Sequence, residues 1–160
     1  MQVYLLRHGI AEDGRPGQPD ADRALTPEGK KKLRGVLKRA KEVGVQPDLI
    51  LSSPYRRAVE TAEIAAHQLD YSRTILRSDT LVPSGKPEAV WDELRIHKDE
   101  PQIMISGHDP LLSNLTAYLL HCPDLQVDFK KGAIIRIDLD RFSAAPRGIL
   151  KWMLVSKLAH

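Results

Sequence analysis

Short apolar runs recur along the chain and alternate with longer segments whose apolar residues follow a helical period. Each run is too short for a helix and ends at polar or basic residues, which is typical of a buried strand. These runs predict strands at residues 3–6, 48–51, 74–77 and 102–105. The amphipathic segments between and after them predict helices at residues 27–43, 54–69, 88–97 and 110–119.

Three of the four predicted helices begin with a capping residue and a proline. Thr26-Pro27, Ser53-Pro54 and Asp109-Pro110 each join an acceptor side chain to a ring that suits the first helical position. In the first helix, Gly44 suits the conformation that follows the last turn. The apolar face of that helix comprises Leu33, Val36, Leu37, Ala40 and Val43.

Strand and helix alternate for most of the chain, and two strands at residues 133–139 and 149–155 finish it with no helical pattern between them. That arrangement predicts a hairpin, because parallel neighbours need a helical crossover. We therefore expect an α/β fold, a three-layer sandwich with a mostly parallel central sheet, helices on both faces and an antiparallel C-terminal hairpin. A chain of 160 residues is expected to form one domain over residues 1–160.

Composition narrows the classes of function. The 24 basic residues are interspersed with 21 acidic ones, and aromatic residues make up 5% of the chain. This argues against nucleic-acid binding, because base stacking needs aromatic side chains. No apolar run has the length of a membrane span, and the first residues lack a secretory-signal pattern, so we expect a cytoplasmic protein that does not bind membranes. We also expect the protein to be a monomer.

Cysteine and histidine usage predicts neither a disulfide framework nor a metal site. Cys122 is the single cysteine of the sequence, so no internal disulfide can form. The histidines outside the strand ends show no metal-ligand spacing with one another, and they are His67, His97, His121 and His160.

Basic residues follow three of the predicted strands directly. Arg7-His8 follows the first strand, Arg56-Arg57 lies in the first turn of the helix after the second, and His108 follows the fourth. Because parallel strands end at one edge of a sheet, these side chains are expected to meet there, beside two helix N-termini with free N–H groups. The sequence therefore predicts a phosphate site at this edge.

These residue types also predict chemistry. A neutral imidazole is a competent nucleophile, and arginines can hold the oxygens of a phosphoryl group during transfer. Nearby arginine cations are expected to lower the pKa of the histidine, which keeps it unprotonated near neutral pH. The chain carries no Walker-type glycine loop, which argues against nucleotide hydrolysis of the P-loop kind.

The motifs at these strand ends resemble those of the histidine phosphatase superfamily, whose fold is phosphoglycerate-mutase-like. They are Leu6-Arg7-His8-Gly9, then Ser53-Pro54-Tyr55-Arg56-Arg57-Ala58 followed by Thr61-Ala62, then Ser106-Gly107-His108, in this order and each after an apolar strand. The short length of the chain and the segment from Asp22 to Gly29 are most similar to the SixA-type phosphohistidine phosphatases.

The resemblance implies roles for the matching positions. His8 would be the nucleophile and form a phosphohistidine intermediate, while Arg7, Arg57 and His108 would bind the phosphoryl oxygens, with His108 as a cation. Gly9 and Arg23 are further candidates for substrate binding. Arg23 can instead pair with Asp20 or Asp22, and Arg56, one residue from Arg57, is expected to face solvent. No cofactor and no metal are implied.

One departure from the family bears on the substrate. Members that act on alkyl phosphates usually carry a carboxylate general acid just after the third strand, where this chain has Val82-Pro83. An alkoxide leaving group needs that proton donor far more than an imidazole does. We therefore expect a phosphorylated histidine protein, such as a phosphotransfer domain, as the substrate. Asp79 or Glu88 could still supply the acid. A small phosphorylated metabolite as substrate, or a non-catalytic phosphate-binding module, are the alternatives.

Overall fold

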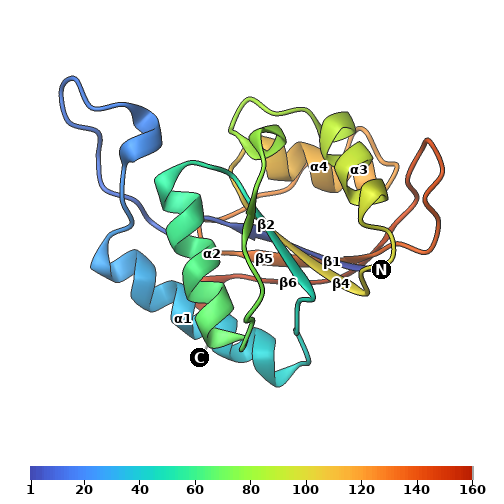
Figure 1. Ribbon diagram of the computed structural model, residues 1–160, viewed down its shortest axis with the longest axis horizontal. Coiled ribbons are helices and arrows are strands. Elements are labelled where there is room, and N and C mark those ends of the chain that lie inside the picture. Colours follow the sequence, from blue (N-terminus) through green and yellow to red (C-terminus); the bar gives the residue numbers. More distant parts are fainter. Residues whose placement is uncertain (160) are drawn as a thin grey trace.

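A six-stranded sheet forms the middle layer of the protein (Figure 1). The computed structural model describes residues 1–159, so His160 lies outside the described residues. The strands have the order β3-β2-β4-β1-β5-β6. Their bounds are β1 Gln2–Arg7, β2 Leu49–Ser52, β3 Leu76–Arg77, β4 Gln102–Gly107, β5 Ile134–Asp138 and β6 Ile149–Leu154.

The pairing of the strands confirms the predicted fold class. The first four strands are parallel, with β1 paired to β4, β4 to β2 and β2 to β3. The last two form the expected hairpin, in which β5 runs antiparallel to both β1 and β6. The carboxyl ends of β1, β2 and β4 therefore lie side by side, at Arg7, Ser52 and Gly107.

Helices cover both faces of the sheet (Figure 1). The helices α1 (Pro27–Glu42) and α2 (Arg56–Gln68) pack on one face, and α3 (Pro87–Ile96) and α4 (Leu111–Leu119) pack on the other. Short 3₁₀ helices, η1 to η3, span Asp20–Asp22, Asp79–Leu81 and Ser156–Leu158. The second of them lies between β3 and α3. No helix among residues 1–159 is long and apolar enough to span a bilayer.

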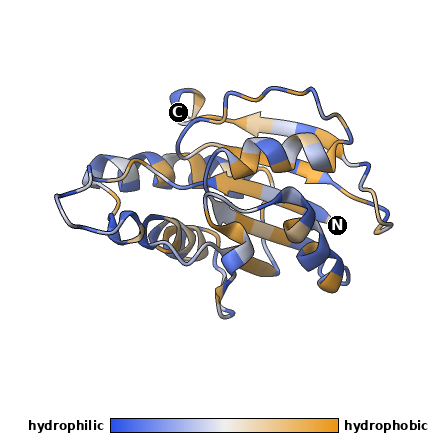
Figure 2. Ribbon diagram, turned by 90° about the horizontal axis from the view of Figure 1, so that it is seen from above, coloured by the Kyte–Doolittle hydropathy of each residue, from blue (hydrophilic) through white to orange (hydrophobic). Residues whose placement is uncertain are grey.

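The central strands are buried on both faces, which explains their continuous apolar runs. In β1, Val3 and Leu5 join the core under α3 and α4, whereas Tyr4 and Leu6 join the core under α1 and α2. Figure 2 shows the hydrophobic residues gathered on the strands, with hydrophilic residues prominent on the helices that cover them. The sequence patterns thus located the strands because nearly every residue of each central strand enters a core.

The helix boundaries follow local capping chemistry, with two differences from expectation. Thr26 caps α1 by accepting a hydrogen bond from the Gly29 amide at 2.9 Å, and Gly44 has the left-handed φ of 90°. Val43, assigned to the apolar face, is 59% exposed because the helix has ended before it. α2 begins at Arg56 rather than at Pro54, because Ser53 Oγ accepts from the Tyr55 amide in a turn before the helix.

Candidate active site

The His8 side chain lies at the carboxyl end of β1 with one ring nitrogen fixed. The His8 backbone N–H donates to the Gly107 carbonyl, which continues the pairing of β1 with β4 past the strand. Its Nδ1 lies 2.7 Å from the Gly9 carbonyl oxygen. A carbonyl can only accept, so Nδ1 carries the proton, and the lone pair of the neutral ring is on Nε2.

The Arg57 guanidinium approaches that lone pair. It comes from the first turn of α2, is 4% exposed, and donates from Nε to His8 Nε2 at 3.3 Å. Its two other nitrogens donate to the Asp20 backbone carbonyl at 2.8 Å and to the Asp20 carboxylate at 3.0 Å. Arg57 is therefore held from one side by η1 and directed at the His8 nitrogen from the other.

The His108 ring lies 5.2 Å from the His8 ring, measured between centroids, and is 1% exposed. Its Nε2 is 2.7 Å from Ser53 Oγ, and the Tyr55 ring meets it edge-on at 5.1 Å. Its Nδ1 is buried with no hydrogen-bonding partner among the described residues. A buried polar atom without a partner is costly in a binding pocket unless a ligand supplies the missing bond.

The Arg7 side chain ends β1 and is in the same situation. Its Nη1 donates to the Phe129 carbonyl at 2.5 Å, which ties β1 to the loop before β5. Its Nε is the other buried side-chain polar atom for which the described part of the chain offers no partner. The structure thus brings Arg7, His8, Arg57 and His108 together as expected, and it leaves Arg7 Nε and His108 Nδ1 with unused hydrogen-bonding capacity that suits an oxyanion.

Both histidines are held neutral in the pocket. The pKa of His8 is lowered to about 4, mainly by burial and in addition by the nearby Arg57, Arg7 and Lys131 cations, against the raising effect of the Gly9 carbonyl. Burial likewise lowers the pKa of His108 to about 3. The expected direction for His8 is confirmed, with burial rather than the arginines as the main cause. The expectation that His108 is a cation is wrong, because burial, with arginines nearby, disfavours its charged form.

Gly9 serves the shape of the site. Its N–H donates to Thr61 Oγ1 at 3.2 Å, and its carbonyl accepts from His8. A Cβ on Gly9 would lie 2.7 Å from a Leu33 side-chain carbon, and one on Gly29 would lie 2.3 Å from the Ile10 carbonyl oxygen. Gly9 was predicted as a substrate contact. Its lack of a side chain allows the turn at His8 to pack closely against α1.

Arg23 reaches the site through Asp20. Its Nε donates to the Asp20 carboxylate at 2.8 Å, and its Nη1 donates to the Glu12 carbonyl at 3.0 Å. The alternative of a pair with Asp20 is therefore the one observed. Arg56 faces solvent as expected, with Glu60 3.7 Å away.

Three contributors to the site were missed by sequence reasoning. Asp20 holds Arg57, Ser53 contacts His108, and Lys131 adds positive charge near His8. Ser53 was interpreted only as a helix cap, although its place between a strand and an arginine-bearing helix was a usable signal. Asp20 and Lys131 lie in loops that no periodic pattern positions.

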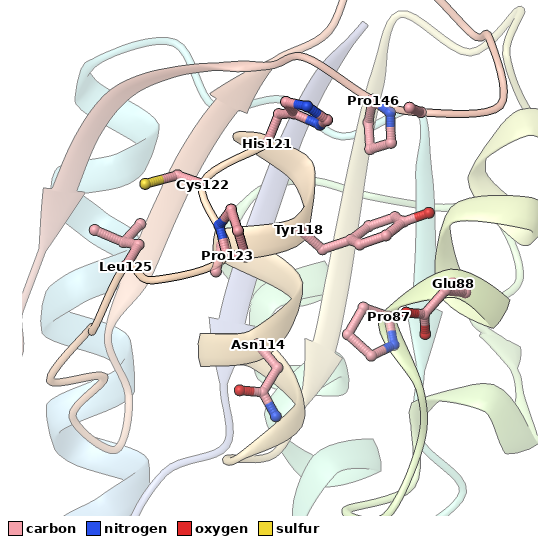
Figure 3. A pocket seen from close by; sticks show the side chains of 11 residues that line it. Pro87, Glu88, Asn114, Tyr118, His121, Cys122, Pro123, Leu125 and Pro146 are labelled. Carbon is pink, nitrogen blue, oxygen red and sulfur yellow. The ribbon is translucent and has the colours of Figure 1, made fainter.

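The candidate acids form no hydrogen bond with the four central residues in the described part of the chain. Asp79 begins η2 and is exposed, and Glu88 lines a cavity of about 420 Å³ between α3 and α4 (Figure 3), with Tyr118 and Asn114. Glu93, unnoticed in the sequence, accepts from the Ser78 and Thr80 hydroxyls at 2.6 Å each. Within residues 1–159, none of these three carboxylates hydrogen-bonds to His8 or His108.

The low pKa values predict acid sensitivity of the fold. An unfolded histidine takes up a proton near pH 6.5, but His8 and His108 stay neutral in the folded state down to about 4 and 3. Below pH 6.5 the unfolded state therefore binds more protons than the folded state. The free energy of unfolding that the neutral histidines contribute is fully present above pH 6.5 and is lost as the pH falls. Between pH 7 and 4.5 we expect each histidine to lower the free energy of unfolding by on the order of 2 kcal/mol.

Urea unfolding at the two pH values measures this loss. The His108→Gln variant, whose side chain cannot be protonated, should show the smaller drop, and the His67→Gln variant, altered at an exposed position, should show the wild-type drop. An equal loss of the free energy of unfolding in the wild type and both variants would contradict the lowered pKa of His108 as a cause of the acid sensitivity.

Comparison with known proteins gives consistent matches. The family model described as histidine phosphatase superfamily (branch 1) matches residues 3–81. An uncharacterized protein of Picosynechococcus sp. is 34% identical over 113 residues, which cover 69% of this chain and 67% of that protein. The mitochondrial serine/threonine-protein phosphatase Pgam5 of Drosophila mojavensis is 33% identical over 85 residues, 53% of this chain, and the match spans 29% of that protein.

A solved structure matches nearly the whole chain. The protein histidine phosphatase SixA, complexed with tungstate, superposes with a TM-score of 0.88 and 28% sequence identity over 98% of both chains. A match over 98% of this chain extends beyond residues 3–81, which the family model covers.

Proposed function

The chain belongs to the histidine phosphatase superfamily and is a phosphatase, and we propose that it hydrolyses phosphohistidine on a protein through a phosphorylated intermediate on His8. The observation that carries the proposal is the His8 ring itself. It is neutral, its Nδ1 proton is held by the Gly9 carbonyl, and its Nε2 lone pair lies among Arg57, His108 and Arg7. The similar SixA structure is a complex with tungstate, a tetrahedral oxyanion like phosphate.

The reaction proceeds in two transfers with the same geometry. His8 Nε2 forms a bond to phosphorus while the bond from phosphorus to the substrate imidazole breaks, and that imidazole, protonated on its other nitrogen, leaves as a neutral ring. Phosphorylated His8 keeps its Nδ1 proton, which is hydrogen-bonded to the Gly9 carbonyl. When the oxygen of water bonds to phosphorus and the bond from phosphorus to Nε2 breaks, His8 therefore also leaves as a neutral ring, and both water protons stay on the released dihydrogen phosphate. The phosphoryl oxygens face the guanidinium groups of Arg7 and Arg57 and the Nδ1 atom of His108. These groups stabilise the charge on the oxygens in each transition state.

The carboxylates near the site favour an imidazole over an alkoxide leaving group. Asp20 is the carboxylate in contact with the pocket, at 3.0 Å from Arg57. Its limited burial raises its pKa, but the hydrogen bonds from Arg23 and Arg57 together lower the pKa by more than burial raises it. The net shift of the pKa is therefore downward. Asp20 is thus ionised at neutral pH and is a poor proton donor. An alkoxide would leave without a general acid, whereas a protonated imidazole needs none.

A substrate comparison tests the proposal. We expect kcat/KM for phosphohistidine in a protein or peptide to exceed that for serine phosphate and sugar phosphate esters by about 10²-fold or more, the usual value of the missing general acid. The measurement is release of phosphate from matched substrates at pH 7. A phosphate ester that is turned over faster would instead favour the activity named for Pgam5 or a metabolite phosphatase. Failure to turn over any substrate would favour a binding module.

A further inference from the structure

A cavity of about 640 Å³ opens directly beside Arg7, at the same edge of the sheet as the proposed phosphate site. Its walls come from the loop before β5, the end of β6, the C-terminal segment with η3, and the first turns of α1. Figure 1 shows the C-terminal end of the chain beside α1, consistent with the packing of η3 against that helix. We call this cavity the basic groove, because its basic side chains are Arg7, Lys32, Lys130, Lys131 and Lys157.

The basic groove is continuous with the site through shared residues. Arg7 lines the groove, and its buried Nε belongs to the phosphate pocket. Lys131 also lines the groove, and its charge lowers the pKa of His8. The loop that carries Lys131 is fixed in place, because the next residue, Gly132, donates its N–H to the carbonyls of Arg7 and His8. A molecule in the groove would therefore lie against the reacting phosphoryl group.

Most of the positive charge in the groove is available to a partner. Asp128 is the one carboxylate among the lining residues, and it lies 3.1 Å from Lys130. Lys32 pairs with Glu28 at 3.0 Å. Both pairs are solvent-exposed, and such pairs contribute little, so a partner can replace them at low cost. Lys131 and Lys157 form no ion pair with any described residue. The chain as a whole is nearly balanced, with 24 basic and 21 acidic residues, so this excess is local.

The apolar part of the groove indicates the class of partner. Between the lysines it is lined by the aliphatic side chains of Ile10, Met153 and Val155, and no aromatic residue lines it. Binding of single strands of nucleic acid relies on aromatic stacking surfaces. Aliphatic side chains ringed by cations instead suit a protein surface that carries carboxylates around apolar residues.

We propose that the basic groove docks an acidic, carboxylate-rich surface of the phosphohistidine protein beside its phosphorylated histidine. The inference rests on the proposed function and specifies the substrate: the phosphorylated histidine enters toward His8 while neighbouring carboxylates bind Lys32, Lys130, Lys131 and Lys157. Charge of this kind acts mainly on the rate of association, by roughly 10- to 10³-fold at low salt.

Synthetic phosphohistidine peptides of equal length test the docking. One carries glutamates around the phosphohistidine, a second carries serines and a third carries lysines, with phosphoimidazole as the substrate that has no flanks. At low salt, the wild-type enzyme should show about tenfold higher kcat/KM for the glutamate peptide than for the serine peptide, and the lowest value for the lysine peptide. The preference should disappear near 1 M salt, where charges are screened within about 3 Å.

Charge-reversal variants test whether the preference for the glutamate peptide depends on the lysines of the basic groove. The double variant Lys32→Glu/Lys157→Glu should lower the ratio of glutamate-peptide to phosphoimidazole turnover about tenfold. The control Lys38→Glu/Lys98→Glu carries the same change in net charge at exposed positions outside the groove, and should keep the wild-type ratio. An unchanged ratio in the groove variant, or an equal loss in the control, overturns the docking. So does a single-stranded oligonucleotide that blocks peptide turnover at physiological salt while glutamate flanks have no effect. Lack of turnover of phosphoimidazole and every peptide would instead contradict the proposed function itself.

Discussion

Replacing His8 with alanine is expected to lower kcat for a phosphohistidine substrate by on the order of 10⁴-fold or more. The reason is that the attacking atom is removed and His108 does not replace it, because no carbonyl among the described residues holds a proton on one of its ring nitrogens as the Gly9 carbonyl does for His8. The neighbouring ring, His108, has its Nε2 against Ser53 and is 5.2 Å from His8 between centroids. Rapid quench with radiolabelled substrate measures both turnover and the phosphoenzyme, which should be acid-labile and absent from the variant.

Two further variants make the His8 result specific. His67 is an exposed histidine on α2, and His67→Ala should retain full turnover and the phosphoenzyme. His8→Gln keeps a polar side chain in the 6%-exposed position, so that loss of activity can be separated from loss of folding by its urea unfolding curve. A folded His8→Gln protein that still turns over substrate at the wild-type rate would remove His8 as the nucleophile.

The fold was largely predictable from the sequence because the central strands are buried on both sides. Val3 and Leu5 enter one core and Tyr4 and Leu6 the other, so β1 appears in the sequence as an uninterrupted apolar run. The hairpin was predictable because no helical pattern separates its strands. The start of α2 was not, since Ser53-Pro54 has the composition of a helix start while Ser53 caps a turn. Val43 was misplaced because a periodic pattern does not record where its helix ends.

The four central residues of the site were predictable for a topological reason. Arg7, His8, Arg57 and His108 follow strands that run parallel, so one edge of the sheet collects them. The rest depends on tertiary contacts. Asp20 meets Arg57 across 37 positions of sequence, through a loop whose course no local preference dictates. The neutrality of His108 depends on burial to 1% exposure, and the charge of a histidine cannot be inferred from its neighbours in sequence alone.

Replacing Arg57 with alanine is expected to lower kcat/KM by about 10²- to 10³-fold, the usual effect of removing one buried donor to a developing oxyanion. Arg57 is 4% exposed, donates toward His8 Nε2 at 3.3 Å and is anchored by Asp20 at 3.0 Å. Arg57→Lys should recover little of the loss, because a single ammonium cannot contact Asp20 and the phosphoryl oxygens together in the way a planar guanidinium does. Steady-state turnover of phosphoimidazole measures the effect without dependence on docking, and turnover of a phosphohistidine peptide measures it with docking included.

The adjacent residue supplies the matched control for Arg57. Arg56 belongs to the same helical turn, but its side chain is 59% exposed and its nearest carboxylate is that of Glu60, at 3.7 Å. Removing its charge changes the net charge by the same amount as removing that of Arg57, so Arg56→Ala should alter kcat/KM by less than about twofold if position rather than charge decides. Equal losses in both variants would mean that the general positive field of the edge, and not the contact between Arg57 and the phosphoryl group, drives the reaction. A large loss confined to Arg57→Ala would place that guanidinium at the reacting phosphorus.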